Sequence, residues 1–412
     1  MSLLDLLPEK EVWERFYEYK TSLVCPKAFA EELRAFIDEG GYLPVAEAIA
    51  RGDRFPLPRK AVLNKLDSRK RRVVYVYPKA ENTVLKLLTW LLLRRYDGLF
   101  SPNLYSFRPG RTARDAVRRL TRAGGIRGMW SYKADISNYF NSIPIPKLTP
   151  LLAGALGEDP GLLRFLCALL EEPEVLEKGQ PIVEEKGIMA GTPLSAFYAN
   201  LYLGELDRHF EEQGVLYARY SDDIILFAGS EEEREAHAAF LRDFLEKQGL
   251  RLNPEKEVFT APGEGWTFLG FRYRDAVIDV APATLRKLKQ KMRRKARALR
   301  RWAQRGDHTG EQAAKAFLRV FKRKLLESPG DNELSWSRWF FPLITTTGSL
   351  RVIDRYAQDC LRFLLSGTRT KGRYNVRYGD LKALGYRSLV HEYYASLEAS
   401  EEASGKTSGE EN

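Results

Sequence analysis

Apolar and polar residues follow one another along the chain in patterns that predict helices separated by short strands. Near the N-terminus, Trp13, Phe16 and Tyr17 share one face at helical spacing. The same periodicity predicts helices over residues 81–98 and 145–178. The basic run SRKRRVVYVYPK leads into β-branched and aromatic residues, which favour a strand. These patterns predict a chain of mixed helix and strand content.

The stretch LYARYSDDIILFA, residues 216–228, places two acids between two apolar runs. Two short strands joined by a tight polar turn form a β-hairpin, and a polar tip readily explains one aspartate. It does not explain both Asp222 and Asp223, because adjacent carboxylates repel each other and the strand pattern carries them toward a buried sheet. A divalent cation bound by both side chains would cancel that repulsion.

A third aspartate ends a separate predicted strand. In SYKADISNYFNSI, Asp135 follows the strand and precedes aromatic residues. If this strand lies beside the hairpin, Asp135 faces Asp222 and Asp223, and the three side chains form the clamp that two-metal phosphoryl transfer requires. Many strands end in Asp, so the spacing alone leaves a shared site and an unrelated strand end as open alternatives.

The C-terminal third has a different composition. Residues 284–305 contain eleven Lys and Arg residues and no acid. Their apolar stripe consists of Leu285, Leu288, Met292, Leu299 and Trp302. This pattern predicts a helix that packs on one face and presents cations elsewhere, to the phosphates of a duplex or to a partner transcript. A plain helical core with a basic surface is the alternative.

Charge and cysteine content narrow the function classes. The chain has 66 Lys and Arg against 55 Asp and Glu, a formal net charge of +11, which favours a polyanionic partner, nucleic acid before an anionic membrane surface. Three widely spaced cysteines and four unclustered histidines provide neither a CxxC metal site nor a disulfide framework, so we expect a cytoplasmic protein. The most apolar stretch, residues 84–96, is too short and too charged to cross a bilayer, so we expect no membrane partner.

The motifs occur in an order that resembles the reverse transcriptases. In chain order the matching stretches are SRKRRVVYVYPKAENTVLKLL, LYSFRPGRTARDA, KADISNYFNSI, GIMAGTPLSAFYANLYLGELD, RYSDDIILFA, GLRLNPEKEVF and WTFLGF. A lone Tyr-x-Asp-Asp is a weak signal, but the collinear set over roughly residues 55–275 is specific. Within that superfamily the chain resembles the bacterial branch, which comprises group II intron, retron and phage-defence-associated enzymes.

The resemblance implies an α+β right-hand polymerase with fingers, a palm of antiparallel sheet plus helices, and a helical thumb. We therefore expect four segments. They are an N-terminal helical extension at residues 1–54, fingers and palm at 55–275, a basic helical thumb with a C-terminal extension at 276–396, and a disordered tail at 397–412. The tail prediction rests on EASEEASGKTSGEEN, which has no large apolar side chain.

The resemblance also implies roles for individual residues. Asp135, Asp222 and Asp223 match the catalytic acids, which bind two Mg²⁺ ions, with Mn²⁺ as the alternative metal. The backbone carbonyl of Ile136 completes the ligands of one ion. Lys256 matches a lysine near the leaving pyrophosphate, where it acts as a general acid or an electrostatic stabiliser. An exposed loop lysine is the alternative.

Other residues match nucleotide and nucleic-acid contacts of the family. Phe140, five residues after Asp135, matches the steric-gate aromatic that excludes a 2′-hydroxyl, although a core aromatic is the alternative. Arg72 matches the fingers cation on the incoming phosphates, with Lys65 and Arg71 as neighbours. The predicted nucleic-acid contacts are Arg108, Arg293, Arg294, Arg297 and Arg301.

One stretch departs from the family pattern. Intron and retron enzymes usually have Pro-Gln-Gly where this chain has Met189, Ala190 and Gly191, so the amide that normally touches the incoming nucleotide is missing. Gly191 still permits close backbone approach, and Ser195 still opens the following helix; both are assigned to nucleotide binding. The departure argues against an intron or retron enzyme and indicates a divergent polymerase.

These assignments predict an RNA-directed DNA polymerase that adds deoxynucleotides by two-metal phosphoryl transfer. The expected partners are an RNA template, a DNA product and dNTPs, with a cognate non-coding RNA and a second copy of the chain as further candidates. The lack of a recognisable RNase H or intron endonuclease segment favours antiphage defence with a dedicated RNA template. The alternatives are RNA synthesis or untemplated addition by the same palm, or a maturase-like RNA-binding module.

Overall fold

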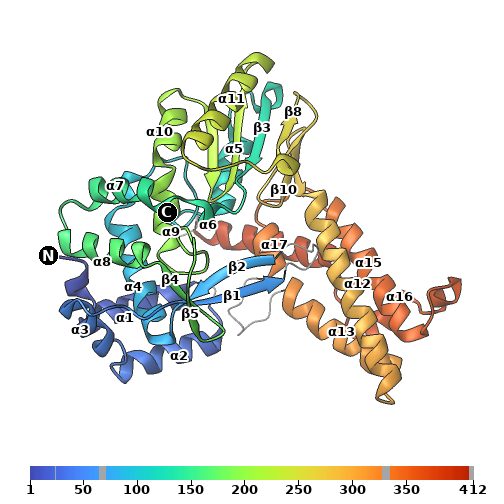
Figure 1. Cartoon of the computed structure of the whole chain (residues 1–412). Helices are drawn as coiled ribbons and strands as arrows, with labels where there is room; N and C mark the ends of the chain where they lie inside the picture. Colours follow the sequence, from blue (N-terminus) through green and yellow to red (C-terminus); the bar gives the residue numbers. More distant parts are fainter. Residues whose placement is uncertain (24, 65–70, 327–334, 408–412) are drawn as a thin grey trace. The chain divides into compact units, whose positions relative to one another are not determined.

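The chain forms two compact units, Met1–Glu264 and Gly265–Asn412. This division falls earlier than the predicted boundary after residue 275, because the strands that follow Gly265 pair with one another and pack with the second unit's helices. The computed structural model describes residues 1–23, 25–64, 71–326 and 335–407 (Figure 1).

The N-terminal helices belong to the core of the first unit. Trp13 is fully buried, its ring stacks on Tyr42 with centroids 4.9 Å apart, and its indole N–H donates to the carbonyl of Leu7 at 2.8 Å. α1 and α3 pack against α4, and α2 packs against α1. The predicted extension is therefore continuous with the fingers and palm. These helices are α1 (Lys10–Ser22), α2 (Lys27–Asp38), α3 (Leu43–Arg51) and α4 (Lys79–Arg95).

A small sheet with the strand order β2-β1-β4-β5 forms the fingers. The helix predicted over residues 145–178 is wrong at its end, where the chain forms a second hairpin. Lys178 and Gly179, with φ of 53° and 86°, form its tip, and two positive φ angles are typical of a type I′ turn. The strands are β1 (Arg59–Asn64), β2 (Arg71–Val76), β4 (Glu174–Glu177) and β5 (Gln180–Val183), and α7 (Ile145–Leu156) and α8 (Pro160–Glu171) precede the last two.

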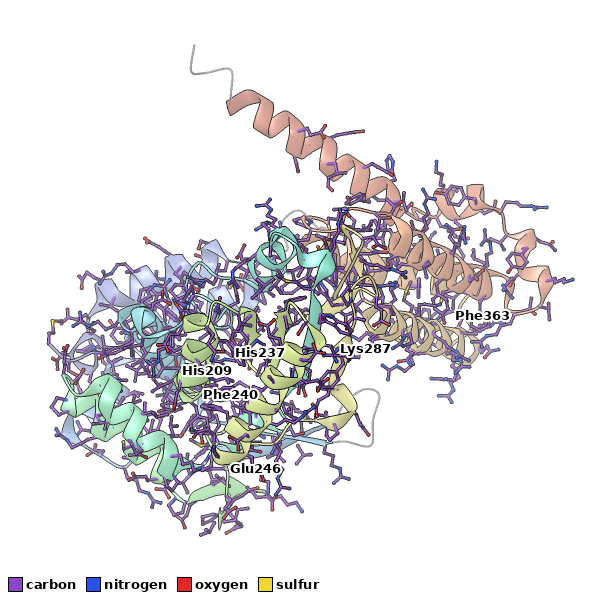
Figure 2. All side chains as sticks on the ribbon, turned by 90° about the horizontal axis from the view of Figure 1, so that it is seen from above. His209, His237, Phe240, Glu246, Lys287 and Phe363 are labelled. Carbon is purple, nitrogen blue, oxygen red and sulfur yellow. The ribbon has the colours of Figure 1, made fainter. Side chains whose placement is uncertain are left out.

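The palm sheet has the strand order β6-β7-β3-β8, and all its described pairings are antiparallel. The side chains of Ile224, Ile225 and Leu226 on β7 are fully buried. α11 packs against β3 and β7, and its Phe240 stacks on His209 of α10 at 3.7 Å (Figure 2). The elements are β3 (Trp130–Asp135), β6 (Leu216–Tyr220), β7 (Asp223–Ala228), β8 (Val258–Thr260), α5 (Ala113–Arg122), α6 (Tyr139–Ser142), α9 (Ser195–Tyr202), α10 (Gly204–Glu212) and α11 (Glu231–Lys247).

The second unit combines a small sheet with helices. Helix α12 packs against α13 and α15, and its buried residues recur at helical spacing: Met292, Ala296, Leu299 and Ala303. The predicted apolar stripe is thus correct in direction, although Trp302 is 42% exposed and stacks on His308. The elements are β9 (Trp266–Phe268), β10 (Phe271–Arg274), β11 (Val277–Val280), α12 (Pro282–Arg305), α13 (Gly310–Leu325), α14 (Trp336–Phe340), α15 (Gly348–Ser366), α16 (Tyr378–Ala383) and α17 (Leu389–Thr407).

The tail that was predicted to be disordered from residue 397 is helical as far as Thr407, where α17 ends. Tyr393 anchors its first half through a hydrogen bond of 2.7 Å to the carbonyl of Ile344. The second half contains alanine and glutamate, which are strong helix formers. Figure 2 shows this second half extending away from the other helices of the unit. Residues 408–412 lie outside the described residues.

Candidate active site

The site is built on the β6–β7 hairpin. Tyr220 pairs with Asp223, so Ser221 and Asp222 form a two-residue tip. Ser221 has a φ of +60°, a left-handed conformation that is unfavourable for a residue with a side chain. The backbone N–H of Ser221 donates to the hydroxyl of Ser106 at 2.9 Å, which holds the tip in this conformation. The predicted hairpin is therefore confirmed, and the hydrogen bond to Ser106 fixes its tip.

A buried polar network supports the hairpin. The Arg219 guanidinium donates to Asp207 through Nε at 2.7 Å and through a second nitrogen at 2.5 Å, and it also donates to the carbonyl of Ser221 at 3.3 Å. Both side chains are at most 1% exposed. Burial alone would lower the pKa of Arg219, but attraction and hydrogen bonds to Asp207 outweigh it and raise the pKa. The network fixes a charged arginine directly beneath the tip.

Strand β3 brings the third aspartate to the hairpin. Asp135 is the register partner of Asp223, and the N–H of Ile136 donates to the carbonyl of Asp222 at 3.1 Å. Burial, followed by repulsion from Asp135 and Asp223, raises the pKa of Asp222. Burial also raises the pKa of Asp223, although Lys133 opposes the shift. The structure therefore gathers the three predicted acids and Ile136 in one partly buried place.

Two lysines lie against these carboxylates. Lys256, at the end of the 3-10 helix Pro254–Lys256, places Nζ 2.6 Å from a carboxylate oxygen of Asp135. Lys133 Nζ lies 3.6 Å from Asp223. Sequence reasoning missed Lys133. Strand alternation places it on the same face of β3 as Asp135, because the two residues are two positions apart. The predicted Lys256 does lie at the acidic cluster.

The donor set suits a divalent cation. Among the described residues, no three His, Cys, Asp or Glu side chains form a ready-made metal-binding cluster. The lysine ammonium groups instead occupy part of the space around the acids. Carboxylate and carbonyl oxygens are the hard ligands that Mg²⁺ and Mn²⁺ accept. Burial and then repulsion from Asp135 and Asp223 keep the pKa of Asp222 raised even though Lys256 opposes the shift, so a cation bound there would relieve the repulsion that remains.

The glycine-rich segment lies against the fingers strand β2. Gly191 has a φ of +102°, and a Cβ at this position would lie 3.1 Å from the carbonyl oxygen of Tyr75. The neighbouring Ala190 accepts a hydrogen bond from the N–H of Tyr75 at 2.8 Å, and its own N–H donates to Asn141 at 2.8 Å. The close approach that Gly191 permits is thus, in this structure, an approach of two backbone segments. Asn141, absent from the predicted site, links them.

Arg72 and Phe140 lie near this junction. Arg72 is exposed on β2 and shares a strand face with Val74, whose Cβ approaches Gly191. Phe140 is half-buried, and its ring centroid lies 6.4 Å from that of Phe107. Their contacts with a nucleotide stay a prediction. Lys65 lies outside the described residues.

Two residues with predicted contacts have side chains that already bond within the fold. Ser195 begins α9 as expected, but it is buried and its hydroxyl donates to the carbonyl of Thr192 at 2.6 Å. The Arg108 side chain is 4% exposed, forms an ion pair with Asp97 at 2.8 Å and donates to the carbonyl of Ser101 at 2.6 Å. Arg108 therefore fixes the loop that it lies in.

The four cations assigned to α12 are exposed, as the helical pattern predicts. Repulsion from Arg293 is the largest cause of a lowered pKa at Arg297, and Arg369 adds to it. This helix therefore presents exposed positive charges that repel one another. The exposed cations are Arg293, Arg294, Arg297 and Arg301.

The family follows from a comparison with known proteins. The sequence model of "Reverse transcriptase (RNA-dependent DNA polymerase)" matches residues 63–273, just over half of the chain. The chain belongs to the reverse transcriptase family. This membership confirms the resemblance and, with the sheets and helices above, the α+β right-hand polymerase fold. Reverse transcriptase domains generally use divalent metal ions, in agreement with the acidic cluster.

Individual relatives cover different parts of the chain. Protein YkfC of Escherichia coli K12 is 24% identical over 258 residues, which span 53% of this chain and 67% of that protein. The group II intron-encoded protein LtrA of Lactococcus lactis is 26% identical over 195 residues, which span 47% of this chain and 31% of that protein. The chain thus spans less than a third of the length of LtrA.

The solved structures that align with the chain include two telomerases. Telomerase from Candida albicans, in complex with a fragment of telomeric RNA, aligns with a TM-score of 0.45 and 12% identity over 88% of this chain and 72% of that chain. Apo telomerase from Candida tropicalis aligns with a TM-score of 0.46 and 12% identity over 81% of this chain and 60% of that chain. Within the described residues, no helix has the length and apolar content to cross a membrane.

Proposed function

We propose that the reverse transcriptase site of this chain copies RNA into DNA by adding deoxynucleotides to the 3′ end of a primer. The observation that carries this proposal is the register between Asp135 and Asp223, with Asp222 at the tip between them. Three carboxylates from paired strands have little freedom to move apart. Such a rigid arrangement orients reacting groups before the reaction begins.

Each of these residues has a role in the proposal. Asp135, Asp222, Asp223 and the carbonyl of Ile136 would hold two Mg²⁺ ions, which when bound activate the primer hydroxyl and stabilise the leaving pyrophosphate. Lys256 is 54% exposed while it pairs with Asp135, so its ammonium group can move to an incoming phosphate. There it would balance charge that develops on the pyrophosphate.

Selection between nucleotides is assigned to the junction of fingers and palm. Arg72 would contact the phosphates of the incoming nucleotide, and Gly191 would let the backbone lie close to it. The half-buried ring of Phe140 would leave no room for a ribose 2′-hydroxyl, so that dNTPs are preferred. The exposed cations of α12 would contact the phosphates of the copied duplex.

Primer extension tests this function. A DNA primer on an RNA template is incubated with Mg²⁺ and with dNTPs or NTPs, and wild type is compared with Asp222→Asn/Asp223→Asn. We expect extension with dNTPs by wild type alone. Preference for NTPs would indicate RNA synthesis instead, and extension without a template would indicate untemplated addition. Phe140→Ala is expected to increase NTP use, because it removes the proposed barrier to the 2′-hydroxyl.

We further propose that the template is one dedicated RNA. A role in antiphage defence, which the sequence favours, would require such a template. The experiment is to sequence the RNA and DNA that copurify with wild type and with the Asp222→Asn/Asp223→Asn variant. A defined cDNA present only with wild type would identify template and product together. If the variant retains full biological activity, the site has no role in it and a maturase-like module explains the chain better.

A further inference from the structure

The second unit contains a pocket that shares no residue with the acidic cluster. Its volume is about 240 Å³, smaller than the roughly 300–1,000 Å³ of sites that enclose a whole small molecule. Its walls come from α12, from α15 and from the 3-10 helix Lys371–Asn375 together with Arg369 before it. Phe363 of α15, which is labelled in Figure 2, is one of the lining residues. Three of the others are arginines: Arg293, Arg369 and Arg373.

Positive charge exceeds negative charge in this pocket. Asp359 is the one acid among its described lining residues. A carboxylate oxygen of Asp359 lies 3.8 Å from Nε of Arg373, and the same oxygen lies 3.8 Å from a guanidinium nitrogen of Arg362. One negative charge is thus shared between two arginines. Within the part of the chain that the structure describes, neither Arg293 nor Arg369 forms an ion pair with an acid.

The other ionisable groups in the lining add no negative charge. Burial, followed by repulsion from Asp359, raises the pKa of the Cys360 thiol to about 12. Burial, followed by repulsion from Cys360, also raises the pKa of Tyr356, although Arg293 and Arg369 oppose this shift by attracting the phenolate. Both groups therefore stay protonated and neutral near pH 7, and the pocket keeps its excess of positive charge.

Arg373 brings a buried donor to the pocket. Its two terminal nitrogens donate to the carbonyl of Arg369 and to the hydroxyl of Tyr374, the second at 2.8 Å. Its Nε is buried and has no hydrogen-bond partner among the described residues, which is rare for a polar atom in a native protein. The guanidinium of Arg369 lies over the ring of Phe363, 4.7 Å from its centroid, and this contact holds it at the pocket. The arginines are therefore positioned before any ligand arrives.

A phosphate group that is joined to its carrier on one side fits these features. Guanidinium groups bind phosphate oxygens through paired, charge-assisted hydrogen bonds. A terminal phosphate carries a charge of about −1.5 to −2 at pH 7, so it balances more than one arginine. The lining residues Ala296 and Cys360 are buried, whereas Arg293 and Arg369 are exposed. A small recess with a buried floor and a cationic rim admits the end of a chain more readily than a strand that must continue on both sides.

We propose that this pocket binds a terminal phosphate group, whose oxygens contact Arg293, Arg369 and Arg373. The inference rests on the proposed function for its choice of ligand, because a polymerase meets two such groups. One is the 5′ phosphate of a nucleic-acid strand, and the other is free pyrophosphate. Binding of either ligand needs no metal and no catalysis, so it is measured separately from synthesis.

The test compares two short single-stranded RNAs of one sequence, labelled at the 3′ end, one with a 5′ phosphate and one with a 5′ hydroxyl. Fluorescence anisotropy in EDTA gives both affinities. Wild type is expected to bind the phosphorylated RNA about tenfold more tightly, the ratio that one charge-assisted hydrogen bond produces. Arg293→Gln/Arg369→Gln is expected to bring this ratio close to one. The loss of a contact to phosphates inside the strand would weaken both RNAs and leave the ratio unchanged.

The matched control is Arg351→Gln/Arg355→Gln, which removes the same charge from exposed positions of α15 outside the pocket. This control is expected to keep the wild-type ratio. Thermal unfolding is measured for every variant. Arg293→Gln/Arg369→Gln is expected to melt no lower than wild type, because Arg293 and Arg369 both repel Arg297. A changed ratio then reports lost binding and not unfolding.

Pyrophosphate is titrated into each protein by calorimetry, also in EDTA. If wild type binds both RNAs equally but binds pyrophosphate, and Arg293→Gln/Arg369→Gln abolishes that binding, free pyrophosphate is the ligand. A wild-type ratio of one without pyrophosphate binding overturns the inference. It is also overturned if folded Arg293→Gln/Arg369→Gln keeps both the ratio and the binding of pyrophosphate, or if the control loses them equally.

The outcomes separate this inference from the proposed function. Asp222→Asn/Asp223→Asn is expected to abolish synthesis and to keep the wild-type ratio of the two RNA affinities. Absent synthesis by wild type, with terminal phosphate binding intact, would overturn the polymerase function alone. Synthesis by wild type without any preference for a terminal phosphate, on RNA or as pyrophosphate, would overturn the pocket alone.

Discussion

The catalytic hairpin and helix α12 both crowd like charges, but in opposite environments. At the hairpin, burial is the largest cause of the raised pKa values of Asp222 and Asp223. On α12, exposed Arg293 is the largest cause of the lowered pKa of Arg297. Buried like charges require rigid support, whereas exposed ones are screened by salt. The acids therefore depend on their scaffold, whereas the charges of α12 depend on solvent and salt.

The largest expected effect comes from removing that scaffold. Asp207→Ala leaves the Arg219 guanidinium buried without its counter-charge, so we expect a loss of about 3–5 kcal/mol in the free energy of unfolding and no primer extension. Urea unfolding and primer extension measure both. Asp207→Leu/Arg219→Met is the control, because apolar residues commonly replace a buried ion pair without loss. It is expected to regain stability but not activity, since the bond from Arg219 to the carbonyl of Ser221 is gone.

The next largest effect is expected for Asp222→Asn, which should change primer extension and folding stability in opposite directions. Asp222→Asn is expected to reduce primer extension on the order of a thousandfold, because metal-ion stabilisation contributes several kcal/mol. In EDTA it is expected to unfold at a higher temperature than wild type at pH 7, because the folded pKa of Asp222 is raised. When the pKa of Asp222 is higher in the folded than in the unfolded state, the contribution of this group to wild-type stability is fully present below the unfolded pKa. That contribution is lost as the pH rises through the folded pKa. The advantage of the variant should therefore vanish in acid.

These variants bear on how much of the hairpin follows from sequence alone. The acids were predictable because strand alternation and motif order are local signals. The same alternation could have indicated Lys133, two residues before Asp135 on one face of β3, but this residue was missed. The Asp207–Arg219 ion pair was not predictable from the sequence, because nothing in the apolar run around Arg219 indicates which helix will supply the counter-charge. That information is tertiary.

Cations illustrate the same limit. Arg108 and Arg293 look alike in sequence, each in a basic stretch, yet Arg108 is closed off by Asp97 and by backbone carbonyls. Whether the Arg108 side chain is exposed depends on how its loop folds back toward Asp97, eleven residues earlier. The α12 cations were predictable because a helix with an apolar stripe leaves its other faces exposed. Ser195 shows the same limit, because its hydroxyl donates to the carbonyl of Thr192 in the preceding turn.

A smaller effect tests the junction between the palm and β2. Gly191→Ala places a Cβ 3.1 Å from the Tyr75 carbonyl oxygen at a φ of +102°. We expect a loss of about 1–3 kcal/mol in stability and a higher KM for dNTPs. Gly154→Ala is the control, because it lies within α7 with no atom within 4 Å of the added Cβ. It should be neutral or stabilising by about 0.5–1 kcal/mol. Equal behaviour of both variants would contradict a constrained junction.

The smallest effect on stability is expected on α12, where removing charge should cost nothing in folding. Arg293→Gln/Arg297→Gln removes repulsion between exposed side chains, so the melting temperature should not fall. If these cations contact a duplex, the plot of log affinity against log salt should become shallower by roughly 1.8, since each lost contact removes about 0.9. Arg351→Gln/Arg355→Gln on α15, also exposed and four residues apart, is the matched control and should keep the wild-type slope. A loss of stability without a change in slope would show that α12 resembles the hairpin after all, with its charges held by the fold rather than by nucleic acid.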